Sequence, residues 1–135
     1  MTEFTGATDP EAEELTGAFW AAARRRELVR PVCGDCGRSF FTPQLACPGC
    51  LSENWTYRTS SGRGTVYSAT VVRKPPSPGF EVPFRLGVVD LEEGWSMLAN
   101  LVGGPDERLP GIDAPVELTW IERDGRVLPA FTEVV

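Results

Sequence analysis

The spacing of hydrophobic positions changes along the chain from helical to alternating, and the change falls near Trp55. Before that point, Leu15, Phe19 and Ala22 recur at the spacing of one helix face, which predicts a helix that continues to about Arg26. After it come short runs rich in β-branched and aromatic residues, which are typical of strands. The runs are Trp55–Thr59, Thr65–Val72, Phe84–Leu91, Ser96–Leu101, Val116–Arg123 and Val127–Phe131. Five or six short strands in about 80 residues predict a small closed or partly closed β-barrel.

Turn residues separate the predicted strands. The segment Ser61–Gly64 precedes the second run, and Glu92-Glu93-Gly94 and Asp124-Gly125 have the composition of hairpin turns. The segment Lys74–Gly79 contains three prolines, which cannot donate a backbone hydrogen bond to a neighbouring strand. We therefore expect this proline loop to be exposed.

Both ends of the predicted helix carry residues that are favourable at helix termini. Asp9 is a suitable N-cap and Pro10 a suitable first helical residue, so residues 1–9 are expected to form a flexible lead. Arg24–Arg26 fall in the last turn, where positive charge interacts favourably with the helix dipole. The alternative is that these arginines form a patch that binds a phosphate-bearing ligand.

Two Cys-x-x-Cys units supply the candidate chemistry of the chain. They are Cys33-Gly34-Asp35-Cys36 and Cys47-Pro48-Gly49-Cys50. A two-residue gap lets a tight turn aim both sulfurs at one ion, and two such turns give four thiolates in a tetrahedron. The pattern predicts one structural zinc ion with no position left for water or substrate. Iron is the alternative metal, because four thiolates also hold it.

The residues around the cysteines refine this interpretation. The spacer Gly37–Ala46 is long enough for a short hairpin, and Phe40 and Phe41 are expected to pack beside the metal. Two disulfides are the other use of four cysteines, but they suit secreted proteins. Residues 1–10 lack the apolar core of a secretion signal, and no apolar run is long enough to span a membrane. We therefore expect a soluble cytoplasmic protein.

Composition limits the functions open to the chain. Its 135 residues carry a net charge of −6, and an acidic protein is poorly suited to bind a nucleic-acid backbone. The chain has no histidine and no cysteine outside the four clustered ones, so the usual general base and thiol nucleophile are both missing. These absences argue against catalysis by the chain alone.

The order of a short helix, a Cys-x-x-Cys ribbon and a small barrel resembles the family first grouped as domain of unknown function 35. The matching strings are Cys33–Gly37, Cys47–Ser52, Trp55, Ser61–Ser68, Val71-Val72, the proline loop and Val89–Gly94. The resemblance implies a mainly β protein with a short N-terminal helix, a rubredoxin-like zinc ribbon and an OB-fold barrel. The expected segments are a lead and helix over residues 1–30, the zinc ribbon over 31–52 and the OB-fold barrel over 53–135. The chain departs from the family pattern at Thr42 and Gln44, where proline and arginine are expected.

Family members resemble companions of thiolase-like enzymes that act on acyl-CoA esters. The resemblance implies a non-catalytic accessory subunit that binds a thiolase-fold aldolase or thiolase in a hetero-oligomer, with acyl-CoA at the shared interface. Because some relatives accompany aldolases that cleave steroid side chains, the preferred reaction is retro-aldol cleavage of a steroid side-chain CoA ester. In the steroid group the domain is often fused behind a hydratase, so this chain is expected to be either a free-standing subunit or an isolated domain.

Cations and apolar residues outside the predicted core are the candidates for ligand and partner contacts. Arg63, Arg73 and Lys74 flank a glycine-rich turn and the proline loop, where they either contact the CoA phosphates or are solvated charges. The candidate partner interface consists of Phe19, Trp20, Pro75, Pro76 and Phe80. For Phe19 the alternative is packing on the chain's own barrel.

Two other functions are the alternatives to an accessory subunit. Zinc ribbons and OB-folds also occur in nucleic-acid-binding proteins, and Trp55, Tyr67 and Phe84 are the residues that would stack on the bases of a single strand. An enzyme acting alone would use Tyr67, Asp90 and Glu92 as acid or base. Tyr67 is expected to be packed, however, and the segment around Asp90 to form a solvated turn. The preferred function therefore includes neither nucleic acid nor membrane as a partner.

Overall fold

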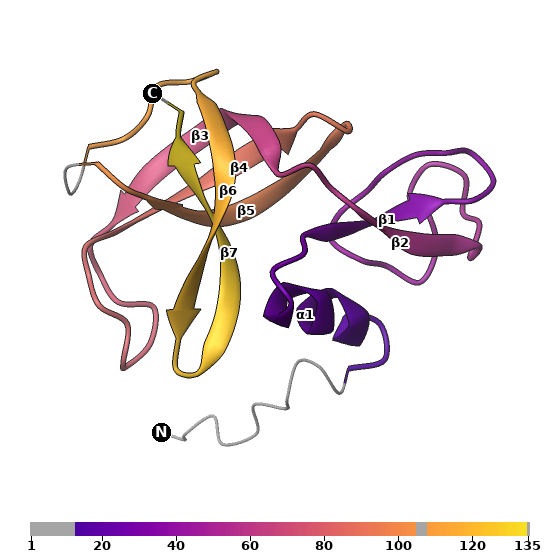
Figure 1. Ribbon diagram of the computed structural model, residues 1–135, viewed down its shortest axis with the longest axis horizontal. Helices are drawn as coiled ribbons and strands as arrows, with labels where there is room; N and C mark the ends of the chain where they lie inside the picture. The colour runs from indigo at the N-terminus through magenta and orange to yellow at the C-terminus, as the bar shows by residue number, and fades with distance from the viewer. Residues whose placement is uncertain (1–12, 105–107, 135) are drawn as a thin grey trace.

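The computed structural model describes residues 13–104 and 108–134, which form one helix and seven strands (Figure 1). In chain order these are α1 (Gly17–Arg24), β1 (Val29–Cys33), β2 (Trp55–Thr59), β3 (Arg63–Val72), β4 (Phe84–Leu91), β5 (Trp95–Val102), β6 (Pro115–Arg123) and β7 (Arg126–Glu133). The strands expected from the sequence are confirmed, and their ends agree with those of β2 to β7 within two residues. The sequence does not predict β1, because Pro31 stands in the middle of this short segment.

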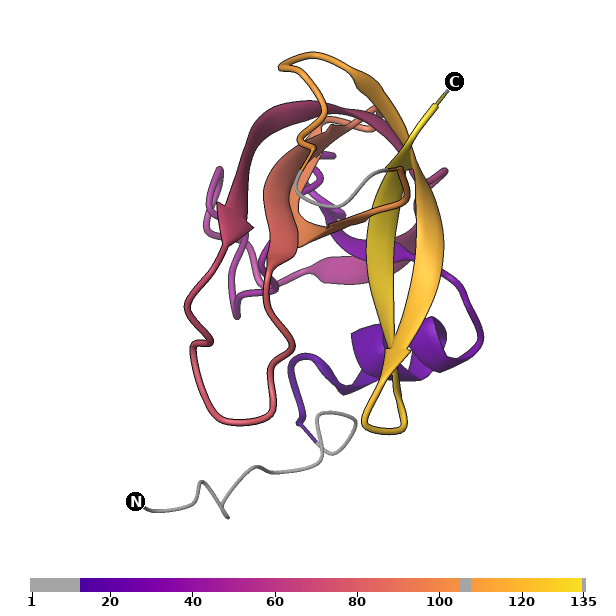
Figure 2. The same cartoon turned by 90° about the vertical axis from the view of Figure 1, so that its left-hand side faces the viewer.

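Five of the strands form a closed barrel in the order β3-β4-β5-β7-β6, and β6 returns to pair with β3 (Figure 2). Neighbouring strands are antiparallel except for β5 and β7, which run parallel. Numbered within the barrel, the order is 1-2-3-5-4, which is the Greek-key arrangement of an OB-fold. The expected hairpin turns join β4 to β5 and β6 to β7, and the proline loop joins β3 to β4.

The barrel interior is filled by alternate side chains of its strands. The large side chains buried there include Val66, Val89, Val116 and Phe131, each no more than 1% exposed. Gly64 lets β3 approach β4 closely, because a Cβ atom at this position would overlap the carbonyl oxygen of Asp90. A bulge in β3 leaves Tyr67 on the outer surface with 64% of the residue exposed, so the expected packing of this side chain is wrong.

Helix α1 begins later than the sequence predicts. Residues 14–16 form a turn, and the first helical residue is Gly17. In this turn the carbonyl of Leu15 accepts a hydrogen bond from the hydroxyl of Tyr57 at 2.7 Å. The cap expected at Asp9-Pro10 lies outside the described residues. Within the part of the chain that the structure describes, no helix is long and apolar enough to cross a membrane.

The arginine triplet spans the end of α1, with only Arg24 in its last turn. Arg24 is the last helical residue. Arg25 forms an ion pair with Glu27 at 3.1 Å, and Arg26 reaches Glu122 of β6 at 3.2 Å. Two of the three guanidinium groups are therefore engaged by carboxylates, which favours the structural role over an anion-binding patch.

The apolar face of α1 closes one end of the barrel. Phe19 is 4% exposed, and its ring centre lies 5.3 Å from that of Phe41, which itself lies 5.3 Å from Trp95. Since the side chain of Phe19 is buried in the chain's own core, it is not accessible to a partner. The prediction that Phe19 belongs to the partner interface is therefore wrong. Phe41, expected beside the metal, packs here instead. Trp20 is partly buried against the same core.

The carboxylate of Glu93 links the segment after β2 to the barrel through hydrogen bonds. It accepts hydrogen bonds from the hydroxyl of Ser60 at 2.7 Å, the N–H of Ser61 at 2.6 Å and the indole N–H of Trp95 at 3.2 Å. Burial raises the pKa of Glu93, but these donors outweigh it and lower the pKa to about 2. The sequence predicts a solvated turn here, whereas Glu93 connects the end of the ribbon to the β4–β5 hairpin.

Candidate metal centre

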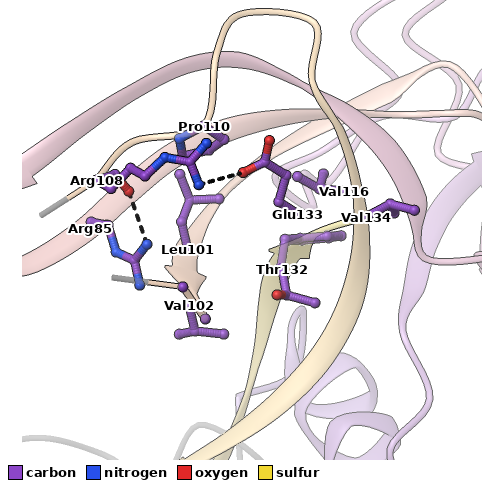
Figure 3. Close-up of a pocket in the computed structure, with 12 residues that line it drawn as sticks. Arg85, Leu101, Val102, Arg108, Pro110, Val116, Thr132, Glu133 and Val134 are labelled. Atoms are coloured by element: carbon purple, nitrogen blue, oxygen red, sulfur yellow. Dashed lines mark hydrogen bonds and ion pairs between the residues drawn. The ribbon is translucent and has the colours of Figure 1, made fainter. Parts of the chain in front are cut away.

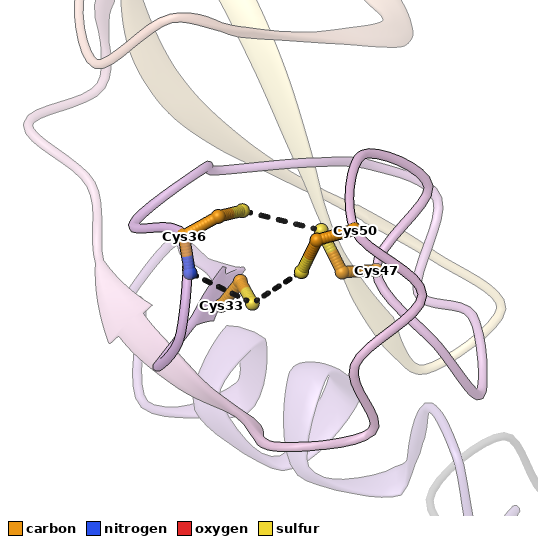
Figure 4. Close-up of side chains that lie close together, drawn as sticks. All are labelled: Cys33, Cys36, Cys47 and Cys50. Atoms are coloured by element: carbon orange, nitrogen blue, oxygen red, sulfur yellow. Dashed lines mark hydrogen bonds between the residues drawn. The ribbon is translucent and has the colours of Figure 1, made fainter.

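The ribbon is built on a two-stranded antiparallel sheet. β1 pairs with β2 in a register that places Cys33 opposite Trp55. β2 therefore belongs to this small sheet and does not pair with the barrel strands. The first cysteine unit begins at the end of β1, and the second lies in the long loop that leads to β2, so the sheet brings the two units together (Figure 4).

The four Sγ atoms converge on one point. All of them lie within 4.8 Å of one another. The Sγ atoms of Cys33 and Cys50 are 3.6 Å apart, and so are those of Cys36 and Cys47 (Figure 4). Four sulfurs at about 2.3 Å from a central zinc ion are separated by roughly 3.8 Å, so the spacing fits a tetrahedral site. It is much longer than the roughly 2.05 Å of a disulfide, and all four cysteines are free.

Backbone N–H groups point at two of the sulfurs. The Sγ atom of Cys33 accepts hydrogen bonds from the N–H groups of Asp35 and Cys36, both at 3.4 Å. The Sγ atom of Cys47 accepts one from Gly49 at 3.3 Å. The N–H of Cys36 contributes most to lowering the pKa of Cys33 to about 6, against the opposing effect of burial. These N–H groups stabilise thiolates, which are the form that binds a metal.

The raised pKa of Cys50 reflects repulsion between neighbouring thiolates, which a bound cation would relieve. The N–H of Ser52 lowers the pKa of Cys50, but the neighbouring sulfur of Cys33 and burial outweigh it and raise the pKa to about 12. Four adjacent thiolates repel one another, and a divalent cation between them removes that repulsion. The donor set and its spacing therefore fit one zinc ion, held by all four cysteines.

Packing closes the site on one side. Cys33 and Cys47 are 2% and 0% exposed and pack with Phe40. The ring centre of Trp55 lies 5.7 Å from that of Phe40, and its indole N–H donates to the carbonyl of Leu45 at 3.2 Å. Because four protein ligands complete the tetrahedron, the ion has a structural role.

The spacer between the two cysteine units does not form the expected hairpin. Over residues 37–46 the only strand-like contact is a single bridge between Ser39 and Val32. Phe40 is directed into the ribbon core and Phe41 into the barrel core. Since these two neighbours are packed in different cores, the spacer joins ribbon and barrel instead of folding back on itself.

The cations predicted to contact CoA do not share one site. Arg63, at the start of β3, forms hydrogen bonds with both carboxylate oxygens of Glu92, at 2.8 and 3.2 Å. This pairing lowers the pKa of Glu92. Arg73 and Lys74 follow the other end of β3, where both are exposed. Because ten strand residues span about 30 Å, Arg63 is far from the other two cations along the strand.

The residues of the predicted partner interface lie in two places. Pro75-Pro76 is exposed in the proline loop. In the same loop the ring of Phe80 stacks on that of Phe84 with centres 5.8 Å apart, and the guanidinium of Arg123 lies 5.3 Å from the centre of the Phe80 ring. The loop is therefore tied to the end of β6. Trp20, on α1, covers the barrel core and is only partly accessible.

Among the described residues, those named for the two alternative functions are not brought together in one site. The carboxylate of Asp90 accepts a hydrogen bond from the hydroxyl of Ser96 at 2.6 Å, and Tyr67 is exposed on β3. The aromatic residues expected to stack on bases are divided, with Trp55 in the ribbon and Phe84 in the barrel.

A pocket of about 270 Å³ lies at the barrel end where β5 and β7 finish (Figure 3). The guanidinium of Arg85 donates to the carbonyl of Arg108 at 3.0 Å, and that of Arg108 lies 3.9 Å from the carboxylate of Glu133. The sequence does not predict this group of residues, because they come from distant segments and meet only when the barrel closes. Both charge signs are present, and the volume is below the roughly 300–1,000 Å³ of most small-molecule sites.

A four-thiolate ribbon followed by a five-stranded Greek-key barrel defines a class of zinc-ribbon and OB-fold proteins. Two family models match consecutive parts of the chain: "ChsH2, rubredoxin-like zinc ribbon domain" over residues 20–56 and "ChsH2, C-terminal OB-fold domain" over residues 57–120. A "DUF35 domain-containing scaffold protein" of Pyrococcus furiosus is 37% identical over 114 residues, which cover 78% of this chain and 83% of the relative. The chain belongs to this family, the domain of unknown function 35, and the resemblance drawn from its motifs is confirmed.

Two longer proteins and one solved structure are also similar. The "Probable enoyl-CoA hydratase alpha subunit" of Thermomonospora curvata is 39% identical over 87% of this chain. The "3-oxo-4,17-pregnadiene-20-carboxyl-CoA hydratase alpha subunit" of Mycobacterium tuberculosis is 37% identical over 84% of it. The chain spans only 37% and 36% of the length of these two relatives. The solved structure "Ltp2-ChsH2(DUF35) aldolase" matches with a TM-score of 0.82 at 34% identity, covering 94% of this chain and 100% of that chain.

Proposed function

We propose that this chain is a non-catalytic accessory subunit that binds a thiolase-fold enzyme acting on acyl-CoA esters. The observation that carries the proposal is the closed metal site: four cysteine ligands leave the ion no position for substrate, and the chain has no histidine and no further cysteine. The relatives support an accessory role, since their names include a scaffold protein, hydratase subunits and an aldolase whose name joins two components. We place the complex in the cytoplasm, where thiols stay reduced.

The reaction we propose for the complex is retro-aldol cleavage of a β-hydroxyacyl-CoA. A steroid side chain is the preferred substrate, because one relative is named for a pregnadiene-carboxyl-CoA. Cleavage requires a base that removes the hydroxyl proton and donors that hold the enolate oxygen of the thioester. The partner supplies the base, while this chain forms one wall of the substrate channel and places cations near the CoA phosphates.

Exposed residues at the end of β3 are the proposed contacts. Arg73 and Lys74, which are exposed after β3, would approach the CoA phosphates, and Arg63 is the third candidate. The proposed partner interface consists of Trp20, Pro75, Pro76 and Phe80. The proline loop suits this role, because its exposed prolines are already restricted in conformation and lose little entropy on binding.

Size-exclusion chromatography of the chain with a candidate thiolase-fold aldolase tests the proposal. The two proteins should elute in one joint peak at micromolar concentration, and the chain should melt at a higher temperature in the mixture than alone. Two separate peaks, with no change in melting temperature, would contradict the proposed association.

A further inference from the structure

Each Cys-x-x-Cys unit forms a tight turn, which we call a knuckle. The two knuckles have similar backbone geometry but differ in the residue that follows the second cysteine, where the backbone is left-handed. The residue after each second cysteine is left-handed, with φ of 77° at Gly37 and 66° at Leu51. Each donates its N–H to the first cysteine of its own unit, at 3.0 Å to the carbonyl of Cys33 and 2.8 Å to that of Cys47. This conformation suits glycine and is unfavourable for leucine. The second knuckle therefore holds a leucine where glycine would fold more easily.

Packing within the chain does not compensate for this conformation. Leu51 is 77% exposed, and Leu45, on the other side of the same knuckle, is 70% exposed. Among the large hydrophobic residues that the structure describes, these two are the most exposed. The N–H of Cys47 donates to the carbonyl of Ser52 at 2.8 Å, which holds the chain segments entering and leaving the knuckle side by side. The two leucines thus flank one short projection, residues 45–51, which we call the ribbon tip.

Two charged groups beside the ribbon tip come from outside residues 39–52: the guanidinium of Arg38 lies against Gly49, and the carboxylate of Asp35 accepts a hydrogen bond from the hydroxyl of Ser52. Residues 39–52 include no Asp, Glu, Lys or Arg, although 24% of the chain is charged. The cysteine ligands inside the tip fix its shape when the metal is bound, so little conformational entropy is lost on docking. A preformed projection that exposes two leucines fits an apolar recess.

We infer that Leu45 and Leu51 anchor the ribbon tip in an apolar recess of the enzyme subunit that this chain is proposed to bind. This inference rests on the proposed function. Two exposed leucines offer on the order of 300 Å², well below the roughly 800 Å² per side of a stable interface. Contact between two convex tips would therefore be too small to form a dimer, whereas a recess surrounds the leucines and adds contacts around them.

Three variants and the wild-type chain test the ribbon tip by binding to the labelled candidate aldolase. Leu51→Gly and Leu45→Gln should each raise the Kd by roughly tenfold or more, as truncation of an interface anchor does. The matched control is Leu98→Gln, because Leu98 is 61% exposed on the outer face of β5. It should bind like the wild type. Leu51→Gly should keep one zinc ion and melt at the same or a higher temperature, because glycine relieves the left-handed position.

The outcomes separate this inference from the proposed function. If the wild-type chain does not bind the aldolase, the proposed function and the ribbon-tip anchor are both wrong. If the wild type binds and both tip variants bind equally well, only the anchor is wrong. A wild-type dimer in sedimentation velocity that Leu51→Gly abolishes would show a second copy as the occupant and overturn the inferred partner. A lower melting temperature of Leu51→Gly would overturn the argument that the leucine is kept at a cost to stability.

Discussion

At the scale of single residues, the cysteine side chains decide whether the ribbon folds. Cys33 is both a ligand and a member of the buried cluster around Phe40. Replacing Cys33 by serine should abolish stoichiometric zinc binding and unfold the ribbon, because structural zinc contributes on the order of 10 kcal/mol to the folding of such modules. Elemental analysis of protein purified without added metal, together with circular dichroism, measures both effects.

The control for this substitution is Ser77→Ala, in the exposed proline loop, which should retain one zinc ion per chain. Iron in place of zinc in the wild-type protein would contradict the choice of metal. Full zinc content in Cys33→Ser would contradict the ligand set.

Glu93 is the residue through which stability should depend on pH. Its pKa of about 2 in the folded chain lies below the ordinary value of 4.5, so its contribution is complete above about pH 5 and is lost as the pH falls towards 2. Glu93→Gln should lower the free energy of unfolding by about 1–3 kcal/mol at pH 7, because the charged acceptor of Ser60, Ser61 and Trp95 is removed.

Urea denaturation at several pH values tests this prediction. The difference in unfolding free energy between wild type and Glu93→Gln should shrink as the pH falls below 4, whatever acid does to the metal site in both proteins. Glu117→Gln, at an exposed position of β6, should match the wild type throughout. A difference that stays constant from pH 7 to pH 3 would show that the Glu93 carboxylate is not the linked group.

At the scale of elements, close approach of β3 and β4 depends on Gly64. A methyl group there would overlap the backbone carbonyl of Asp90, which cannot move without disturbing the pairing of the two strands. Gly64→Ala should therefore lower the free energy of unfolding by about 1–3 kcal/mol. Gly111 is the matched control, because a methyl group at this position meets no atom within 4 Å.

Chemical denaturation of the two alanine variants measures the difference. Gly111→Ala should be neutral or slightly stabilising, because alanine restricts the unfolded chain. Equal effects of the two substitutions would mean that the strand contact at Gly64 is not tight.

The barrel strands follow from the sequence because each has one face in the core and one face outside, and this alternation is visible in the order of residues. The turn before α1 does not follow, because one of its contacts, from Tyr57 to the carbonyl of Leu15, joins residues 42 positions apart. The same limit applies to Phe40 and Phe41, which are adjacent in sequence but pack in different cores. Local patterns predict an element, whereas distant contacts decide its ends and its neighbours.

At the scale of the whole molecule, the metal site is predictable because its ligands lie in two compact units with fixed spacing. The pocket at the barrel end is not, because Arg85 and Arg108 are 23 positions apart and meet only through the closed sheet. For the same reason the sequence groups Arg63 with Arg73, although β3 holds them at opposite ends. What the assembled molecule presents is a closed metal site and an exposed loop and tip, which are features of a binding subunit.

The most direct test of an accessory role is turnover of a steroid side-chain β-hydroxyacyl-CoA ester by this chain alone, by the candidate aldolase alone and by the two together. The chain alone should give no product, and the mixture should be faster than the aldolase alone. Tyr67→Phe should leave kcat of the mixture within a few-fold, since this side chain lies on the outer face of the barrel. Product formed by the chain alone, or loss of turnover with Tyr67→Phe in an intact complex, would show that this chain supplies a catalytic group and would contradict the account.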